Sequence, residues 1–259
     1  MEILRTSRPK VVALSPEGLG VVVPEHPETA RQMFAAHPDV MAAVDGPMFG
    51  YCPGQPHNYA TYQCGKVDYL LQDTRSGVNL PAKPGNEGKG ITVSLVGNRL
   101  VGSRGASPAP SAIAAVQLYP ALVIEGRAVE GLSDTDRTGR VAVGILRDGR
   151  LGFAYTAASM PDFAALLASA GFVWAGYTDG GGSSSLVTRE DGMLRGTDTD
   201  DPDGRRVPSW IVWREPDRWL LSGDAKLFGM VIPAASLASG VLALVLLAIL
   251  AIYLWRRKH

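Results

Sequence analysis

The sequence predicts an α+β fold, mostly antiparallel sheet with a few helices, followed by one C-terminal transmembrane helix. Short apolar runs separated by turn residues recur up to residue 213, and few helices stand between them, which favours antiparallel pairing. The chain has 30 glycines, well above the usual share of about 7%, which implies many tight turns. A run of 29 residues without a charged side chain, from Leu227 to Trp255, supplies the membrane segment.

The elements follow from apolar runs and the turn residues between them. A strand, turn and strand are expected over 11–23, and single strands over 40–44, 172–177, 186–188 and 210–213. Polar turns between paired apolar runs predict hairpins over 90–101, 121–129 and 141–156. Helices are expected over 27–36, where Pro27 stands near the start, and over 160–170, where Gly171 marks the end. Loops are expected over 50–66, 103–110 and 198–206.

Composition excludes several classes of protein. With 46% hydrophobic and 19% charged residues, the chain is not disordered. Two cysteines exclude a disulfide-dense scaffold and a four-thiolate zinc site. The 25 basic and 25 acidic residues give a net charge of zero, which argues against nucleic acid as the main partner.

The apolar C-terminal segment sets the predicted domain boundaries. Its length exceeds the roughly 20 residues that span a bilayer as a helix, and Tyr253 and Trp255 stand where interfacial aromatics belong. We expect a globular domain over 1–222, a juxtamembrane linker over 223–229, a transmembrane helix over 230–255 and a basic tail over 256–259.

The charges around this segment predict its orientation. The basic tail favours a cytoplasmic C-terminus, which would place residues 1–226 outside the cytoplasm. Near the N-terminus, Val11–Leu14 is too short for the core of a signal peptide. Two possibilities follow: a leader absent from this sequence, or a tail-anchored protein with a cytoplasmic domain. We favour the extracytoplasmic arrangement.

The most informative motif for chemistry is Asp179-Gly180-Gly181-Gly182-Ser183-Ser184, directly after a predicted buried strand. Three glycines let backbone N–H groups turn toward one point, and such a nest binds anions, phosphate above all. The two hydroxyls add donors, and Asp179 is aimed into the same place. The structural alternative is a flexible Gly/Ser loop.

Two further segments are weaker when each is taken alone. Asp134–Arg140 leads into a predicted strand and contains Arg137, a side chain suited to bidentate recognition of phosphate or carboxylate. Asp45-Gly46-Pro47-Met48-Phe49 places a carboxylate and a chain breaker at a strand end. Each of these segments by itself is more typical of a solvated turn.

Together, and in this order, the three motifs resemble the phosphodiester glycosidase family over roughly residues 20–215. The Asp179–Ser184 motif is similar to the family's Leu-Asp-Gly-Gly-Gly-Ser-Ser, and Arg137-Thr138 with Gly144 and Tyr119–Val123 add to the resemblance. The resemblance implies a hydrolase that acts on a sugar-1-phosphodiester. The family's first motif usually reads Asn-Gly-Gly-Phe-Phe, so Asp45 and Pro47 are departures. Asp45 adds a negative charge that would repel phosphate, so it would contact sugar hydroxyls or a metal, or the substrate is not the family's usual one.

A mechanism can be assigned to these residues. The leaving group would be a phosphate monoester, so the reaction needs a clamp on growing phosphate charge and a carboxylate beside the anomeric carbon. Arg137 and the amides of 180–182 would form the clamp, and Asp179 or Asp45 would be the nucleophile or the base that activates water. Thr138, Ser183 and Ser184 complete the expected substrate-binding set.

Alternatives remain open at this point. The protein could be an anchored, non-catalytic module that binds a carbohydrate or phosphoglycan, or a glycosidase for an uncharged glycan with Arg137 paired to an acid. No metal site or cofactor is expected, although crowded carboxylates over 198–204 leave calcium open. His57 is an acid–base candidate, and Cys52 and Cys64 could form a disulfide or stay free thiols. The tryptophans near the predicted membrane are expected in the core or at a bilayer-facing rim: Trp210, Trp213 and Trp219.

Overall fold

The structure is a computed structural model, and it describes residues 9–47, 67–190, 192–195, 206–215, 225–227 and 230–232. The chain divides into two compact units, Met1–Arg214 and Glu215–His259. The described part of the first unit holds three antiparallel sheets and two α-helices. The predicted α+β class with mostly antiparallel sheet is therefore confirmed for this unit.

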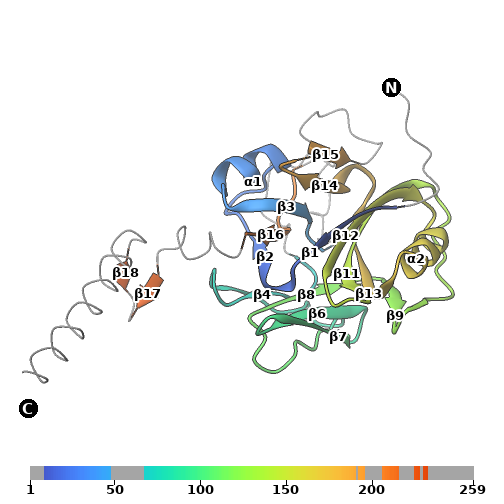
Figure 1. The fold of residues 1–259 in the computed structure, drawn as a ribbon, viewed down its shortest axis with the longest axis horizontal. Helices are drawn as coiled ribbons and strands as arrows, with labels where there is room; N and C mark the ends of the chain where they lie inside the picture. The colour runs from blue at the N-terminus through green and yellow to red at the C-terminus, as the bar shows by residue number, and fades with distance from the viewer. Residues whose placement is uncertain are drawn as a thin grey trace, which may run out of the picture. The chain divides into compact units, whose positions relative to one another are not determined.

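The first sheet contains two hairpins from the second half of this unit (Figure 1). Its six strands follow the order β1 (Lys10–Leu14), β12 (Leu151–Ala158), β11 (Thr138–Leu146), β13 (Phe172–Gly180), β9 (Ala121–Ile124) and β10 (Arg127–Ala128). Two predicted hairpins, β9–β10 and β11–β12, are confirmed. Strand β13 runs on to Gly180, so part of the motif expected after the strand belongs to the strand itself.

The second sheet brings together segments from both ends of the unit. Its order is β15 (Gly192–Arg195), β14 (Ser185–Thr188), β3 (Val40–Asp45), β16 (Trp210–Arg214) and β2 (Leu19–Val22). The two predicted strands that flank residues 15–18 lie in different sheets, because β1 pairs with β12 whereas β2 pairs with β16. A 3₁₀ turn over Pro16–Gly18 connects them.

The third sheet is built around the hairpin of β6 (Ile91–Val96) and β7 (Arg99–Arg104), which the sequence predicted. The full order is β5 (Val78–Leu80), β4 (Leu71–Asp73), β8 (Ala114–Leu118), β6 and β7. Strands β4, β5, β8 and β15 were not expected. β4 and β5 have only three residues each, too few for a clear alternation of apolar and polar side chains.

Both predicted helices form, and their caps explain where they begin. In α1 (Ala30–Ala36), Thr29 and Gln32 make a reciprocal capping box. In α2 (Met160–Ser169), the Ser159 hydroxyl accepts a hydrogen bond from the Asp162 amide at 3.2 Å. Helix α2 packs its buried side chains against the first sheet, and α1 packs against the second (Figure 1).

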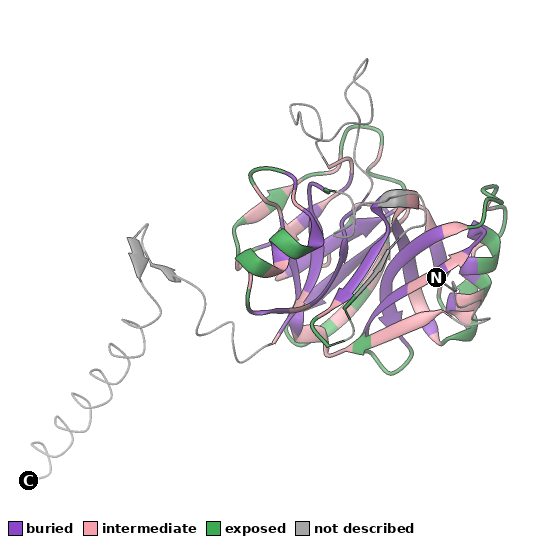
Figure 2. Cartoon of the chain, turned by 90° about the horizontal axis from the view of Figure 1, so that it is seen from above, coloured by how far each residue is buried: buried purple, intermediate pink, exposed green. Residues whose placement is uncertain are grey.

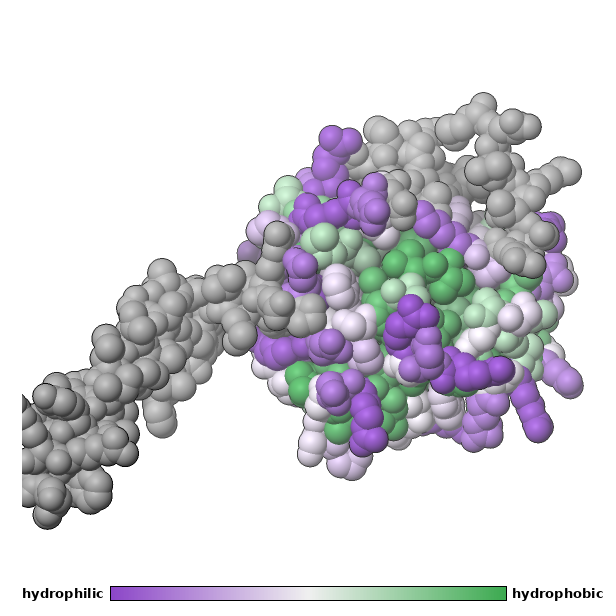
Figure 3. Space-filling view, viewed as in Figure 1, coloured by the Kyte–Doolittle hydropathy of each residue, from purple (hydrophilic) through white to green (hydrophobic). Residues whose placement is uncertain are grey.

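The main core lies where the three sheets meet. One cluster of buried side chains takes members from all of them, including Val21 of β2, Ile91 of β6 and Phe153 of β12. Figure 2 shows these buried strands inside a shell of half-buried and exposed segments. The face in Figure 3 mixes hydrophilic and apolar surface, and Val101 is the large apolar side chain most exposed among the described residues. Two smaller clusters lie beneath the helices, one between α2 and the first sheet and one between α1 and the second.

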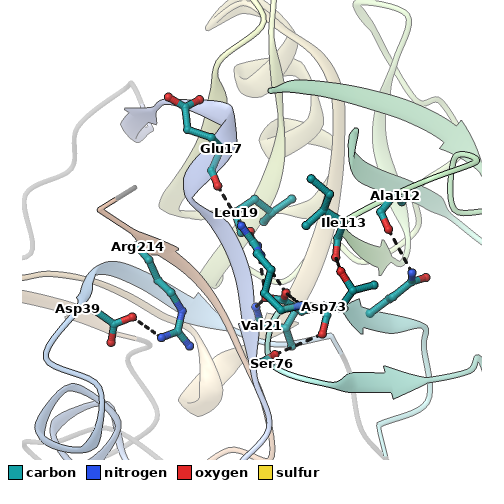
Figure 4. A network of polar contacts seen from close by, with 12 residues as sticks. Glu17, Leu19, Val21, Asp39, Asp73, Ser76, Ala112, Ile113 and Arg214 are labelled. Carbon is teal, nitrogen blue, oxygen red and sulfur yellow. Dashed lines mark hydrogen bonds and ion pairs between the residues drawn. The ribbon is translucent and has the colours of Figure 1, made fainter. Parts of the chain in front are cut away.

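A buried polar network joins the second and third sheets (Figure 4). The Asp73 carboxylate, on β4, accepts hydrogen bonds from the Val21 amide at 3.1 Å and from Arg75 Nε at 3.0 Å. Arg75 also donates to the carbonyls of Glu17 and Leu19. Close by, Arg214 at the end of β16 and Asp39 just before β3 form a buried ion pair. Because a buried carboxylate without partners is costly, these contacts fix how β2 and β4 meet.

In the described part of the second unit, strands β17 (Ala225–Leu227) and β18 (Met230–Ile232) form a two-stranded antiparallel ribbon. Residues 230–232, where the transmembrane helix was expected to begin, are therefore strand. No helix among the described residues is both long and apolar enough to cross a membrane. The rest of the predicted span, 233–255, and the basic tail lie outside the described residues.

Candidate functional site

The candidate site lies where several strand ends meet. Asp45 ends β3, Asp179 and Gly180 end β13, and Ser185 begins β14. On β11, Arg140 is paired with Gly180 across the first sheet. Residues far apart in the sequence are thereby brought together. The motifs at Asp45 and Asp179 share this site, and the Asp134–Arg140 motif reaches it through Gly139 and Arg140, whereas its Arg137 is paired with Asp162 of α2.

Asp45 is fully buried beneath this site. Its carboxylate accepts a hydrogen bond from the Ser185 amide at 2.8 Å and one from the Thr178 hydroxyl at 3.1 Å. Burial raises the pKa of Asp45 well above its ordinary value, and the nearby negative charge of Asp179 raises it further. The two hydrogen bonds oppose this shift without cancelling it. Asp45 therefore holds a proton more readily than an exposed aspartate does.

Asp179 stands on an irregular part of β13. In the pairing with β11, Tyr177 lies opposite Ala142, and Gly180 lies opposite Arg140. The two residues between them on β13, Thr178 and Asp179, therefore stand opposite a single residue of β11, Val141. Such a β-bulge re-aims side chains and is common beside active sites. Asp179 is half-buried, and its Oδ1 atom accepts a hydrogen bond from the Gly180 amide at 2.8 Å. Of the two carboxylates, Asp179 is the one nearer to solvent.

The glycines of the predicted anion nest differ in what they do. Residues Gly181–Ser183 form a 3₁₀ turn, and Gly181 has a φ of 62°, which favours glycine. Gly180 has an extended backbone. Its amide donates a hydrogen bond to the Asp179 carboxylate, so this amide points at a carboxylate. The Ser184 hydroxyl is buried and donates to the Gly139 carbonyl at 2.7 Å. The turn is thus held by contacts within the protein, and Ser183 is buried beside Ser184.

The two arginines near the start of β11 have different surroundings. Arg137 is 69% exposed and forms an ion pair of 3.1 Å with Asp162 of α2, and the half-buried Thr138 follows it. Arg140 is 1% exposed, and it donates to the carbonyls of Ala158 at 2.7 Å and Asp136 at 2.8 Å. Sequence reasoning selected Arg137 and missed Arg140. The signal for Arg140 was its place directly before the apolar run 141–146, which marks the buried part of the strand.

Several predicted candidates lie outside the described residues: His57, Cys52, Cys64, Trp219 and the acidic segment 198–204. The hypotheses about an acid–base histidine, a disulfide and calcium stay predictions. Within the described ranges, no group of three or more Asp, Glu, His or Cys side chains is placed to hold a metal ion. Trp210 is fully buried, and Trp213 is half-buried and donates to the Ser15 carbonyl at 2.9 Å, which confirms core packing for these two.

The fold is similar to that of solved proteins. The structure is similar to the catalytic domain of zebrafish N-acetylglucosamine-1-phosphodiester alpha-N-acetylglucosaminidase, which was solved auto-inhibited by its pro-peptide. The TM-score is 0.57 with 11% identity, over 83% of this chain and 85% of that one. A hypothetical protein from Synechocystis matches with a TM-score of 0.50 and 16% identity, over 79% of this chain and 59% of that one. These likenesses show the fold.

The sequence itself carries the family assignment. No curated protein sequence matches this chain. The profile of the phosphodiester glycosidase family, however, matches residues 39–213, which includes Asp45, Arg140 and the Asp179–Ser184 motif. The matched segment is well over half of the 259 residues. The chain therefore belongs to the phosphodiester glycosidase family.

Proposed function

We propose that this protein is a membrane-anchored glycosidase that hydrolyses a sugar-1-phosphodiester, with Asp179 as its catalytic carboxylate. The observation that carries the proposal is the pair of carboxylates at the ends of β3 and β13. The pKa of Asp45 is raised by burial and by Asp179, while Asp179 is half-buried at the bulge. Two carboxyl groups in environments this different are typical of sites that hold one acid and one base.

The reaction fits these residues. A phosphate monoester leaves with little help from a proton donor, so the main requirement is a carboxylate beside the anomeric carbon. Asp179 would attack that carbon or activate a water molecule. Asp45 is buried and would act from behind Asp179, where its proton reduces the repulsion between the two groups.

The phosphate clamp would come from the two flanking segments. The ion pair of Arg137 with Asp162 is exposed, and exposed pairs contribute only about 0–1 kcal/mol, so Arg137 can exchange this partner for a phosphate. The amides of Gly181 and Gly182 would supply the backbone part of the clamp. Thr138 is half-buried and would add a substrate contact, whereas the buried Ser183 and Ser184 would act by holding the turn in place.

The test is release of free sugar from a panel of N-acetylglucosamine-1-phosphodiesters by the purified full-length chain. Asp179→Asn should lower kcat by at least about 10³-fold, since it removes the reacting carboxylate and keeps the side-chain size. Asp148→Asn, at an exposed turn, is the matched control and should leave the rate unchanged. Arg137→Ala should raise KM for the charged substrate. An Asp179→Asn rate equal to that of the wild type would rule out the catalytic assignment.

The second candidate is a non-catalytic, membrane-anchored module that binds a carbohydrate or phosphoglycan. The full burial of Asp45 favours it, because a buried carboxylate cannot itself touch a substrate. Isothermal titration with the same panel separates the two candidates. Binding without sugar release would support the module, whereas release abolished by Asp179→Asn would support the enzyme.

A further inference from the structure

Tyr177 occupies a position in the site that the mechanism above does not use. It lies on β13 two residues before Asp179, and its side chain is 5% exposed. Its hydroxyl oxygen lies 1.6 Å from the point where a Cβ atom on Gly180 would stand. Gly180 has an extended backbone with a φ of −140°, so its conformation does not itself require glycine. The glycine at position 180 therefore makes room for the phenol of Tyr177.

The same phenol also lies close to Arg140. The guanidinium carbon of Arg140 lies over the Tyr177 ring, 5.8 Å from the ring centroid, within the range of a cation–π contact. Arg140 also lowers the pKa of the Tyr177 hydroxyl, against the larger effect of burial. Arg140 is in turn fixed by the Asp134 carboxylate at 3.0 Å and by two backbone carbonyls. Tyr177 thus lies against two neighbours, the buried guanidinium of Arg140 and the end of β13 at Gly180.

The hydroxyl of Tyr177 lies within the electrostatic influence of both carboxylates. Burial raises the pKa of Tyr177, and the negative charges of Asp179 and Asp45 raise it further, while Arg140 opposes them. The hydroxyl therefore stays protonated through the neutral range. A neutral hydroxyl has one donor and two acceptor positions. Its proton can therefore be donated to a carboxylate oxygen while its lone pairs face the positive charge of Arg140.

We propose that Tyr177 is a positioning residue of this site, and that its hydroxyl connects Arg140 to the Asp179–Gly180 segment and holds the Asp179 carboxylate in one orientation. The proposal rests on the catalytic role proposed for Asp179. Without the hydroxyl, Arg140 loses a partner and a gap opens above Gly180. The Asp179 carboxylate, which also accepts from the Gly180 amide, would then be held less firmly in the orientation that faces the anomeric carbon.

The first test compares Tyr177→Phe with the wild type in the full-length chain. Phenylalanine keeps the ring, its packing and the cation–π contact, and removes only the hydroxyl. We expect kcat to fall about 10–100-fold with KM within about twofold, because a small misplacement of a reacting group lowers the rate without weakening ground-state binding. Tyr69→Phe is the matched control, since Tyr69 is also 5% exposed but lies just before β4, stacked on Tyr119.

The pH profile separates positioning from a purely structural role. The ionisable groups whose charges act on the hydroxyl are Asp45 from β3, Asp179 from its own strand and Arg140 from β11, and Arg140 is ion-paired with Asp134. A lost donor destabilises the ionised carboxylate, so the acid limb of the profile should move to higher pH in Tyr177→Phe. The Tyr69→Phe profile should overlay that of the wild type.

A second measurement does not need activity. Carboxyl carbon resonances in aspartate-labelled protein can be followed through an acid titration of wild type, Tyr177→Phe and Tyr69→Phe. We expect the titration of the Asp179 and Asp45 pair to shift upward by about half a pH unit or more only in Tyr177→Phe. If the wild type releases no sugar but this shift occurs, the proposed function fails while the connection through Tyr177 stands. Overlaid titrations and an unchanged kcat in Tyr177→Phe would overturn the inference.

Discussion

Asp45 shows how one buried side chain connects stability with pH. Burial and the charge of Asp179 raise its pKa in the folded protein above the value in the unfolded chain. The folded state therefore binds the proton more tightly than the unfolded chain does. The resulting contribution to the free energy of unfolding is fully present below the ordinary pKa of aspartate. This contribution is lost as pH rises from that value to the raised pKa. At neutral pH, Asp45 is thus a destabilising residue that the fold tolerates.

Asp45→Asn should therefore stabilise the protein near pH 7. An asparagine can still accept from the Ser185 amide, and its amide group can donate to the Thr178 hydroxyl oxygen. We expect a rise in the melting temperature of about 2–4 °C, which is the shift that about 1 kcal/mol produces in a domain of this size. The melting temperature of the variant should also depend less on pH than that of the wild type. Thermal unfolding across pH measures it, with the exposed Asp162→Asn as control. A variant that melts below the wild type at pH 7 would contradict this account.

The pairing of β11 with β13 forms the base of the site at the level of elements. The bulge at Thr178 and Asp179 aims the strand end, and Gly144 further along β11 lets the two strands approach closely. A Cβ atom on Gly144 would stand 2.1 Å from the Trp174 carbonyl oxygen and 2.8 Å from the Ala175 Cα atom. Both contacts are with backbone, which cannot turn aside as a flexible side chain can.

Gly144→Ala should separate β11 from β13. We expect the free energy of unfolding to fall by about 3 kcal/mol, the upper part of the usual range for overpacking. Gly88→Ala is the matched control, because no atom lies within 4 Å of the Cβ atom it would add. Denaturant unfolding of both variants gives the comparison. Equal stability of the two would mean that the strands can move apart at little cost.

At the scale of the whole molecule, the anchored form that we propose depends on the C-terminal segment. The charge-free run from Leu227 to Trp255 and the basic residues after it support an anchor with the globular unit outside the cytoplasm. The full-length chain should sediment with membranes and need detergent for release, whereas deletion of residues 230–259 should yield a soluble protein. Protease added to intact cells should digest residues 1–226. A full-length chain found in the soluble fraction would refute the anchor.

The sequence alone determined most of what is local in this protein. The two helices and three hairpins follow from capping residues, turn residues and apolar periodicity, which act over a few positions. The family could be recognised because Asp179–Ser184 is a contiguous motif. The very short strands β4 and β5 were missed since three residues give no readable alternation, and pairing partners decide such strands.

The tertiary structure alone decided which residues meet. Strands β1 and β2 belong to different sheets because β1 pairs with β12 and β2 pairs with β16, each more than 100 residues away in the sequence. The burial of Asp45, its coupling to Asp179 and the contrast between Arg137 and Arg140 arise from strand ends that meet in space. Tyr177 looked like an ordinary strand residue until its hydroxyl was seen against Gly180 and Arg140. Burial, and with it pKa and orientation, belongs to the packed molecule, because desolvation depends on every neighbour and sequence spacing records only the adjacent ones.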